Sequence, residues 1–215
     1  CHLESCMPYN DKEWYKRLAE RSDMSSGLTH LTRESDLHGN VEDVLFKILC
    51  EKRLAASDPR VGLICGAQNA VCFQDIPLHS ICQNVFYEQK KREENNYYKL
   101  RYRALGLMFD KSYAFSKGAR PVVYDKTEDA KAYLPSDEWW RIVNLNLENP
   151  NHIVDWTHER EWRHLGDFSF ELSKVTLLTI NMATVNNLNE RYKAVYGVDL
   201  ISQLKGVVTL NNILF

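Results

Sequence analysis

The sequence predicts a single α+β domain. Segments with the pattern of strands gather in the middle and C-terminal half of the chain, and the clearest helical patterns lie near its beginning and end. This arrangement differs from the regular strand–helix alternation of a parallel α/β sheet. Of the 215 residues, 44% are hydrophobic and 26% charged, which is enough for one ordinary globular core. We therefore expect one domain over 1–215, with 1–25 as an N-terminal helical extension.

Apolar residues at helical spacing, together with capping residues, predict the helices. In 10–24, Trp14 and Leu18 share one side and charged residues surround them. A second helix is expected to begin after the candidate N-cap Asn40 and to end near Arg53. Further helices are expected over 80–99, 112–118, 127–134 and 184–196.

Alternating or continuous apolar runs predict the strands. These runs occupy 28–32, 61–66, 70–78, 101–111, 119–125, 138–147, 175–180 and the final stretch 207–215. The segment 153–172, IVDWTHEREWRHLGDFSFEL, is rich in aromatic and β-branched residues, and Gly166-Asp167 supplies a turn signal. We interpret it as a hairpin in which 157–165 pairs with 167–172.

This predicted hairpin carries the densest group of ionisable side chains. Residues two apart on a strand share a face, so Glu159, Glu161 and Arg163 would line one side. Two carboxylates beside an arginine can stabilise a cationic transition state. A salt-bridged, solvated strand is the structural alternative.

The strand at 28–32 offers a second polar group. His30 and Thr32 would point the same way with Arg33 next to them, and they could hydrogen-bond a ribose or an amide. A half-buried histidine at a strand end is the alternative. A third group is basic: 89–103 interleaves tyrosines with cations such as Lys99, Arg101 and Arg103. Cations and planar rings can bind single-stranded nucleic acid, although Glu93 and Glu94 interrupt the segment and a solvated helix is the alternative.

Other classes of function find little support. The net charge is −2, so no overall electrostatic attraction to nucleic acid is expected. No apolar run approaches a membrane span and no signal-like leader opens the chain, so we expect a cytosolic protein without membrane contact. Cys65, Cys72, His79 and Cys82 lack the paired spacing of structural zinc sites, and we predict no metal site. P-loop, GxSxG and HExxH motifs are absent.

The order of several motifs resembles a known family. GLTHLT, AVCFQDIPL, LGLMFDKSYAFSKGARPVVYD and EREWR, spread over 27–165, are similar to the segments of the AbiGi-type abortive phage-resistance family. The same order resembles, more remotely, the ADP-ribosyltransferase fold, including the DNA-modifying DarT toxins. A His-x-Thr strand begins that fold and binds NAD, and a late strand bears the catalytic glutamate. VCFQDIPL stands where the arginine-modifying transferases have a Ser-Thr-Ser strand, and the DarT glutamate motif is not reproduced literally.

The resemblance implies two packed, mostly antiparallel sheets flanked by helices, with a cleft between 28–33 and 157–163. It further implies an NAD-dependent effector of antiviral defence that modifies nucleic acid or protein. Glu161 would be catalytic, with Glu159 second, and NAD would be bound by His30, Thr32, Arg33, Tyr113 and Tyr124. For Tyr113 and Tyr124, a place in the core is the alternative. Lys99, Arg101 and Arg103 would bind a nucleic-acid acceptor. The alternative is a non-catalytic binding module on the same fold, such as an antitoxin or immunity protein with a cognate toxin or phage protein as its partner.

Overall fold

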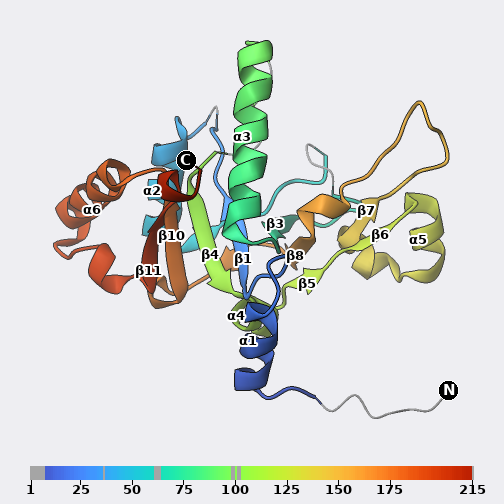
Figure 1. Cartoon of the computed structure of the whole chain (residues 1–215), viewed down its shortest axis with the longest axis horizontal. Coiled ribbons are helices and arrows are strands. Elements are labelled where there is room, and N and C mark those ends of the chain that lie inside the picture. The colour runs from blue at the N-terminus through green and yellow to red at the C-terminus, as the bar shows by residue number, and fades with distance from the viewer. Residues whose placement is uncertain (1–7, 36, 61–63, 98–99, 101–102, 215) are drawn as a thin grey trace.

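A seven-stranded mixed sheet forms the centre of the molecule (Figure 1). The structure is a computed structural model that describes residues 8–35, 37–60, 64–97, 100 and 103–214. Its strands lie in the order β11-β10-β4-β1-β3-β8-β5, and all neighbours are antiparallel except β10 and β11. Their bounds are β1 (Gly27–Leu31), β3 (Ala70–Gln74), β4 (Gly106–Asp110), β5 (Arg120–Pro121), β8 (Glu161–Leu165), β10 (Val175–Thr179) and β11 (Gly206–Thr209).

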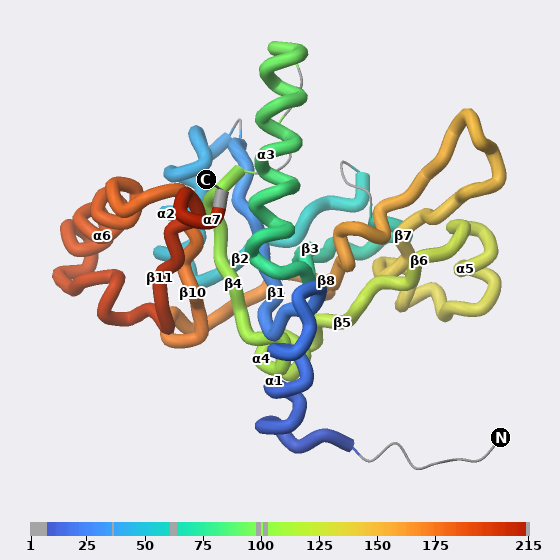
Figure 2. Tube along the Cα trace, in the orientation of Figure 1, coloured from blue at the N-terminus to red at the C-terminus, as the bar shows by residue number. Residues whose placement is uncertain are grey.

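Two small sheets and the helices complete the fold. β2 (Arg53–Leu54) pairs with β9 (Phe168–Ser169), and β6 (Val123–Asp125) runs parallel to β7 (Ile142–Asn144). The α-helices are α1 (Asp11–Ala19), α2 (Val41–Glu51), α3 (Leu78–Glu94), α4 (Lys111–Ser116), α5 (Thr127–Tyr133), α6 (Met182–Tyr196) and α7 (Asn211–Leu214). The 3₁₀ helices are η1 (Ser136–Arg141), η2 (Thr157–Glu159), η3 (Leu172–Lys174) and η4 (Ile201–Gln203). Figure 2 shows α3 projecting from the body of the molecule.

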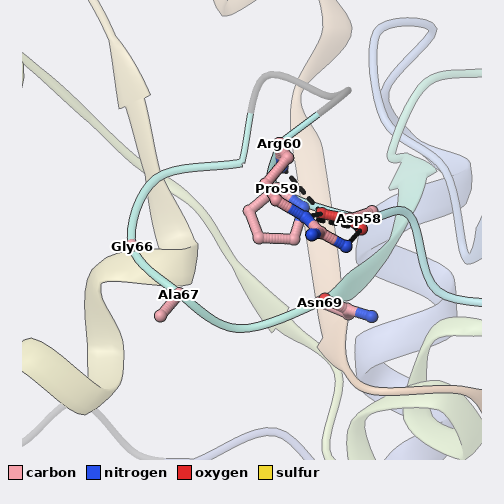
Figure 3. Close-up of a pocket in the computed structure, with 6 residues that line it drawn as sticks. All are labelled: Asp58, Pro59, Arg60, Gly66, Ala67 and Asn69. Atoms are coloured by element: carbon pink, nitrogen blue, oxygen red, sulfur yellow. Dashed lines mark hydrogen bonds and ion pairs between the residues drawn. The ribbon is translucent and has the colours of Figure 1, made fainter.

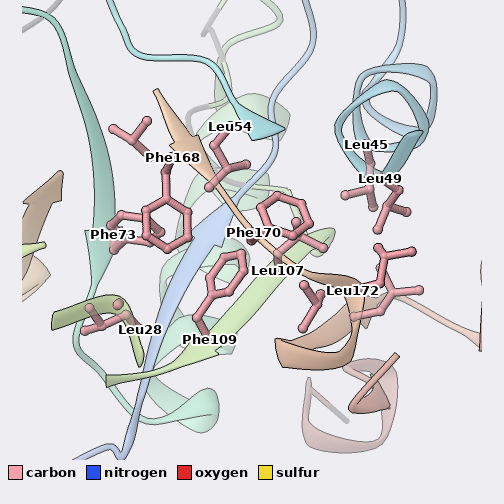
Figure 4. Close-up of a cluster of buried hydrophobic side chains, with 14 of the residues drawn as sticks. Leu28, Leu45, Leu49, Leu54, Phe73, Leu107, Phe109, Phe168, Phe170 and Leu172 are labelled. Atoms are coloured by element: carbon pink, nitrogen blue, oxygen red, sulfur yellow. The ribbon is translucent and has the colours of Figure 1, made fainter. Parts of the chain in front are cut away.

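Helices cover the central sheet on both faces. On β4, Leu107 and Phe109 point into the larger core, where α2 and α6 pack (Figure 4). Met108, between them in sequence, packs on the opposite side in the core that α3 covers. This alternation follows from the two-residue period of a strand. The larger core is rich in aromatic rings; those of Phe109 and Phe168, for example, meet edge to face with centroids 5.1 Å apart.

The α+β class is confirmed, and several local predictions hold. Asn40 caps α2, because its side-chain oxygen accepts bonds from the backbone N–H groups of Glu42 and Asp43. The helix expected over 184–196 is α6, and the core strand expected within 101–111 is β4. The N-terminal extension contains α1. The strand expected over 61–66 lies partly outside the described residues.

The expected hairpin and the expected pair of packed sheets are wrong. Strand β8 pairs with β3 and β5, whereas β9 pairs with β2, so the two halves of 157–172 join different sheets. Gly166 turns the chain with a φ of 68°, but it leads away from β8 instead of folding back on it. The strand expected over 138–147 begins as the 3₁₀ helix η1, and the one over 119–125 divides into β5 and β6. The hairpin error concerns strand partners that are distant in sequence.

Candidate functional site

The pairing of β3 with β8 positions the candidate site. Their antiparallel register sets Gln74 opposite Glu161 and Cys72 opposite Arg163. The side chains of these four residues therefore share one face of the sheet. Trp162, next in sequence to Glu161, packs instead against the larger core on the other face.

Arg163 fixes the carboxylate of Glu161. Its Nε lies 2.7 Å from Glu161 Oε1, and its Nη2 lies 3.3 Å from Glu161 Oε2. Arg163 is only 2% exposed, and its Nη1 also donates to the carbonyl oxygens of Trp140 at 2.6 Å and Ile142 at 3.1 Å. A guanidinium that is bound on several sides has little freedom to move. It therefore holds the Glu161 carboxylate in one orientation.

The second carboxylate approaches from a short 3₁₀ helix. Glu159 ends η2, and Arg160 after it adopts the left-handed conformation with a φ of 46°, which interrupts the strand alternation. Glu159 is buried and accepts a hydrogen bond from the side-chain amide of Gln74. On the outer side, His158 Nε2 lies 3.6 Å from Glu159 Oε1, and the His158 side chain is 56% exposed. Gln74 thus hydrogen-bonds Glu159 and, in the register of β3 with β8, stands opposite Glu161.

Tyr124 completes this group. Its hydroxyl oxygen accepts a hydrogen bond from the backbone N–H of Glu161 at 2.7 Å. Burial, together with the negative charges of Glu161 and Glu159, raises the pKa of Tyr124 to about 12. Burial is also the main cause that raises the pKa of the Cys72 thiol, and the charge of Glu161 adds to it. We call Gln74, Tyr124, Glu159, Glu161 and Arg163 the carboxylate cluster.

A row of polar residues extends the cluster across the sheet. Thr29 on β1 is the Cα partner of Gln74, which in turn is the partner of Glu161. Within the described part of the chain, Thr29 Oγ1 and Gln74 Oε1 are buried without a hydrogen-bond partner. A buried polar atom without a partner is costly, and it is a reason to look for a ligand.

Two of the residues predicted to bind NAD lie on the other face. The His30 ring packs against Phe73 at 6.0 Å, and its Nδ1 lies 2.9 Å from the Cys72 carbonyl oxygen. Burial lowers the pKa of His30. Tyr113 packs against the larger core, where Phe73 also lies. Since Phe73 alternates with Gln74, neither His30 nor Tyr113 shares the face of Glu161.

The prediction that 28–33 and 157–163 face each other across a cleft is therefore wrong. Strand β3 lies between β1 and β8 and bonds to both, so the two segments are not facing walls of one opening. Thr32 follows β1, where its backbone N–H donates to the Leu105 carbonyl at 2.8 Å. Its Oγ1 is buried and, among the residues described, has no hydrogen-bond partner.

The predicted basic residues lie apart from the cluster. Arg33 and Arg103 line a small cavity of about 90 Å³ together with Glu34, Arg92 and Leu100. Arg103 forms an ion pair with Glu34. Lys99 and Arg101 lie outside the described residues.

A larger cavity of about 400 Å³ lies along the loop that connects β2 to β3 (Figure 3). Asp58, Pro59, Arg60, Gly66, Ala67 and Asn69 line it. Arg60 bonds Asp58 within the same turn, and this bond is the main cause that lowers the pKa of Asp58 to about 2. The two charged groups of this cavity neutralise each other, so it offers less chemistry than the carboxylate cluster.

Comparison with known proteins gives no assignment: no family model, no curated protein and no solved structure matches this chain. In the described part of the chain, no helix has the length and apolar character needed to cross a bilayer. The same residues contain no group of three or more histidine, cysteine or acidic side chains arranged to bind a metal ion.

Three members of the polar row and cluster were not predicted as site residues. Gln74 carried a sequence signal, since it is a polar residue at the end of the apolar run AVCFQ. Arg163 was predicted to share a face with the glutamates, and the structure confirms this for Glu161. Thr29 gave no signal of its own, because its place opposite Gln74 depends on a pairing between distant strands.

Proposed function

We propose that the carboxylate cluster cleaves the N-glycosidic bond of NAD and that the protein is an ADP-ribosyltransferase-like effector of antiviral defence. The observation that carries the proposal is the pair Glu159 and Glu161 around Gln74. Their side chains are only 8% and 15% exposed. Paired carboxylates of this kind serve glycosidic chemistry, in which positive charge develops on the sugar. The resemblance of the EREWR and CFQDIPL segments to AbiGi-type and DarT-like proteins adds the link to defence.

In this proposal Glu161 acts through its charge. Its carboxylate would stabilise the positive charge that develops on the ribose as nicotinamide leaves with the bonding electron pair. Such stabilisation is strongest when the charged group is already oriented and partly shielded from water. The Arg163 fork supplies the orientation, and the largely buried setting supplies the shielding.

Glu159 would handle the proton. An acceptor hydroxyl or amine that attacks the anomeric carbon must lose a proton, and a nearby carboxylate can take it. His158 lies at the outer side of Glu159 and is exposed, so it could pass this proton to solvent. Tyr124 positions Glu161 through the bond from the Glu161 backbone N–H.

The residues present fit NAD in part. Thr29 Oγ1 and Gln74 Oε1, buried without partners among the described residues, could accept or share hydrogen bonds with a ribose hydroxyl or the nicotinamide amide. His30 and Tyr113 do not join them, because they face the opposite side of the sheet. In this proposal Thr29 and Gln74 therefore take the binding role that the resemblance gives to the His-x-Thr strand.

Nicotinamide release from NAD tests the proposal. The parent protein should release nicotinamide, alone or with cell extract as acceptor, and Glu159→Gln and Glu161→Gln should each lower the rate at least about a hundredfold. Glu128→Gln is the matched control, since this exposed glutamate lies on α5. Because Glu161 neutralises a buried arginine, each variant must also be checked for folding by its melting temperature. Absence of turnover in the parent, combined with no NAD binding by calorimetry, would end the enzymatic proposal.

One observation favours a second candidate function, a non-catalytic binding module. Both carboxylates of the cluster already have partners within the protein, so the cluster can serve stability alone. This candidate predicts a stable complex with a protein partner such as a toxin or phage protein. It further predicts that a folded Glu159→Gln variant keeps that complex unchanged.

A further inference from the structure

We propose that Arg33, Arg92 and Arg103 form a binding pocket for a phosphoryl group, which we call the arginine pocket. Three guanidinium groups line it against one carboxylate, that of Glu34, and Leu100 forms the remaining wall. Arginine is suited to phosphate because its planar fork can donate two parallel hydrogen bonds to the oxygens. This inference stands apart from the proposed NAD chemistry, because it uses none of the residues of the carboxylate cluster.

The backbone holds two of these arginines together. Strands β1 and β4 pair up to Leu31 and Gly106, and the bond from Thr32 N–H to the Leu105 carbonyl, 2.8 Å long, continues the ladder by one step. Arg33 directly follows Thr32, and Arg103 lies two residues before Leu105, so this bond brings together the two segments from which both arginines line the cavity. Arg92 comes from the last turn of α3. The three cations thus come from the ends of two paired strands and from the end of a helix.

The charges of the pocket are unbalanced. Glu34 forms an ion pair with Arg103, and its side chain is 58% exposed, so the pair is accessible to solvent. Arg33 is exposed and, within the described residues, forms no ion pair. Arg92 also lines the cavity and has an interaction of its own. Because Arg33 adds its charge to the Arg103–Glu34 pair, positive charge exceeds negative charge here although the net charge of the chain is −2, and this favours an anion.

The size of the pocket restricts what can enter. Its volume of about 90 Å³ is well below the roughly 300 Å³ at which pockets for whole small ligands begin. A single phosphoryl group fits, and the rest of its ligand must lie outside. Tyr97, three residues before the wall residue Leu100, has a 96% exposed side chain. Its ring could stack on a base attached to the bound phosphate.

Phosphoryl groups can come from a free nucleotide or from a nucleic-acid strand, and two probes distinguish these sources. Binding of AMP is measured by calorimetry, and binding of a labelled oligo(dT) strand by fluorescence anisotropy over a series of salt concentrations. Binding of either probe that depends on the pocket supports the proposal, and the tighter probe identifies the source. A methylphosphonate strand, which lacks backbone charge, should not bind.

Variants connect the binding to the pocket. Arg33→Gln and Arg92→Gln should each weaken binding about tenfold, the loss expected for one charged hydrogen bond. For the strand, each should also reduce the slope of log affinity against log salt by about one. Glu34→Gln should strengthen binding, because Glu34 is the only carboxylate among the described residues that line the pocket. Arg17→Gln on α1 is the control of equal charge change and should have little effect.

Clear results would overturn the proposal. It fails if neither probe binds the parent protein, or if Arg17→Gln weakens binding as much as Arg33→Gln does. It fails equally if Glu34→Gln weakens binding while the melting temperature is unchanged. Tyr97→Ala should weaken binding of the strand and leave binding of inorganic phosphate unaltered. None of these measurements requires NAD turnover, so failure of the NAD proposal would leave them unaffected.

Discussion

The buried ion pair between Arg163 and Glu161 provides the sharpest test of the structure. Removing one member of such a pair leaves an uncompensated charge in the interior, at a cost of about 3–5 kcal/mol. Arg163 is 2% exposed, so it cannot regain water without a local opening of the fold. Glu161→Gln keeps an acceptor oxygen but removes the negative charge, and we expect a loss near the lower limit, about 3 kcal/mol.

Arg163→Met should lower the free energy of unfolding by about as much, for a different reason. It removes the charge, but it also takes a donor from the carbonyl oxygens of Trp140 and Ile142, at about 1 kcal/mol each. The double variant should cost less than the sum of the two singles, because neither charge is then left alone. We expect a coupling energy of at least about 1 kcal/mol in a double-mutant cycle. Urea denaturation of the four proteins measures it.

Two outcomes would refute this reasoning. Additivity of the two changes within about 0.5 kcal/mol would show that the charges do not interact in the folded protein. A loss below about 1 kcal/mol for Glu161→Gln would show that Arg163 is not buried as described. Equal slopes of the urea transitions in all four proteins are needed for the comparison, since a changed slope indicates a changed denatured or native state.

Three further predictions concern single positions. Burial lowers the pKa of His30 in the folded protein, so between the ordinary histidine pKa of 6.5 and this lowered pKa the unfolded chain binds more protons. The free energy of unfolding should therefore fall by up to about 1.4 kcal/mol per pH unit as the pH falls through this range. In urea denaturation between pH 7.5 and 5.5, His30→Gln should make the free energy of unfolding less dependent on pH. Gly106→Ala should lower the melting temperature, because its methyl group would stand 2.9 Å from the Leu31 Cα atom on the paired strand; a temperature equal to the parent's would contradict this β1–β4 approach. Lys52→Gly should stabilise the protein by up to about 1 kcal/mol in urea titration, since Lys52 caps α2 with a φ of 53°, where glycine is favoured; a loss of stability would count against that conformation.

Sequence reasoning succeeded where the determining interactions are local. Asn40 and the apolar stripe behind it define α2, because a cap and a helical period both act within a few residues. The same holds for Glu161 and Arg163, whose shared face follows from strand period alone. The hairpin prediction failed because β8 pairs with β3, whose Gln74 is far from Glu161 in sequence. Turn signals beside a strand say nothing about such a partner.

The face of His30 shows how much of a site depends on register. Thr29 and His30 alternate, and two successive pairings, Thr29 with Gln74 and Gln74 with Glu161, decide which of them shares the face of the glutamate. If either pairing were shifted by one residue, His30 instead of Thr29 would share the face of Glu161. No pattern within the strand carries this information. The predicted set of NAD-binding residues therefore divided between two faces although the strand that carries His30 was correctly located.

The Arg163–Glu161 pair requires a reason other than stability. An apolar pair of similar volume would often be as stable as a buried ion pair, since desolvation offsets much of the attraction. Arg163, unlike an apolar residue, hydrogen-bonds the Ile142 carbonyl, at the start of β7, and both oxygens of Glu161 at once. Strand β7 runs beside β6, which carries Tyr124, and the Tyr124 hydroxyl accepts the Glu161 N–H. Arg163 thus ties the central sheet to the small β6–β7 sheet at the position of Glu161. A carboxylate fixed from both sides in this way is suited to acting on a ligand, which is the role that we propose for it.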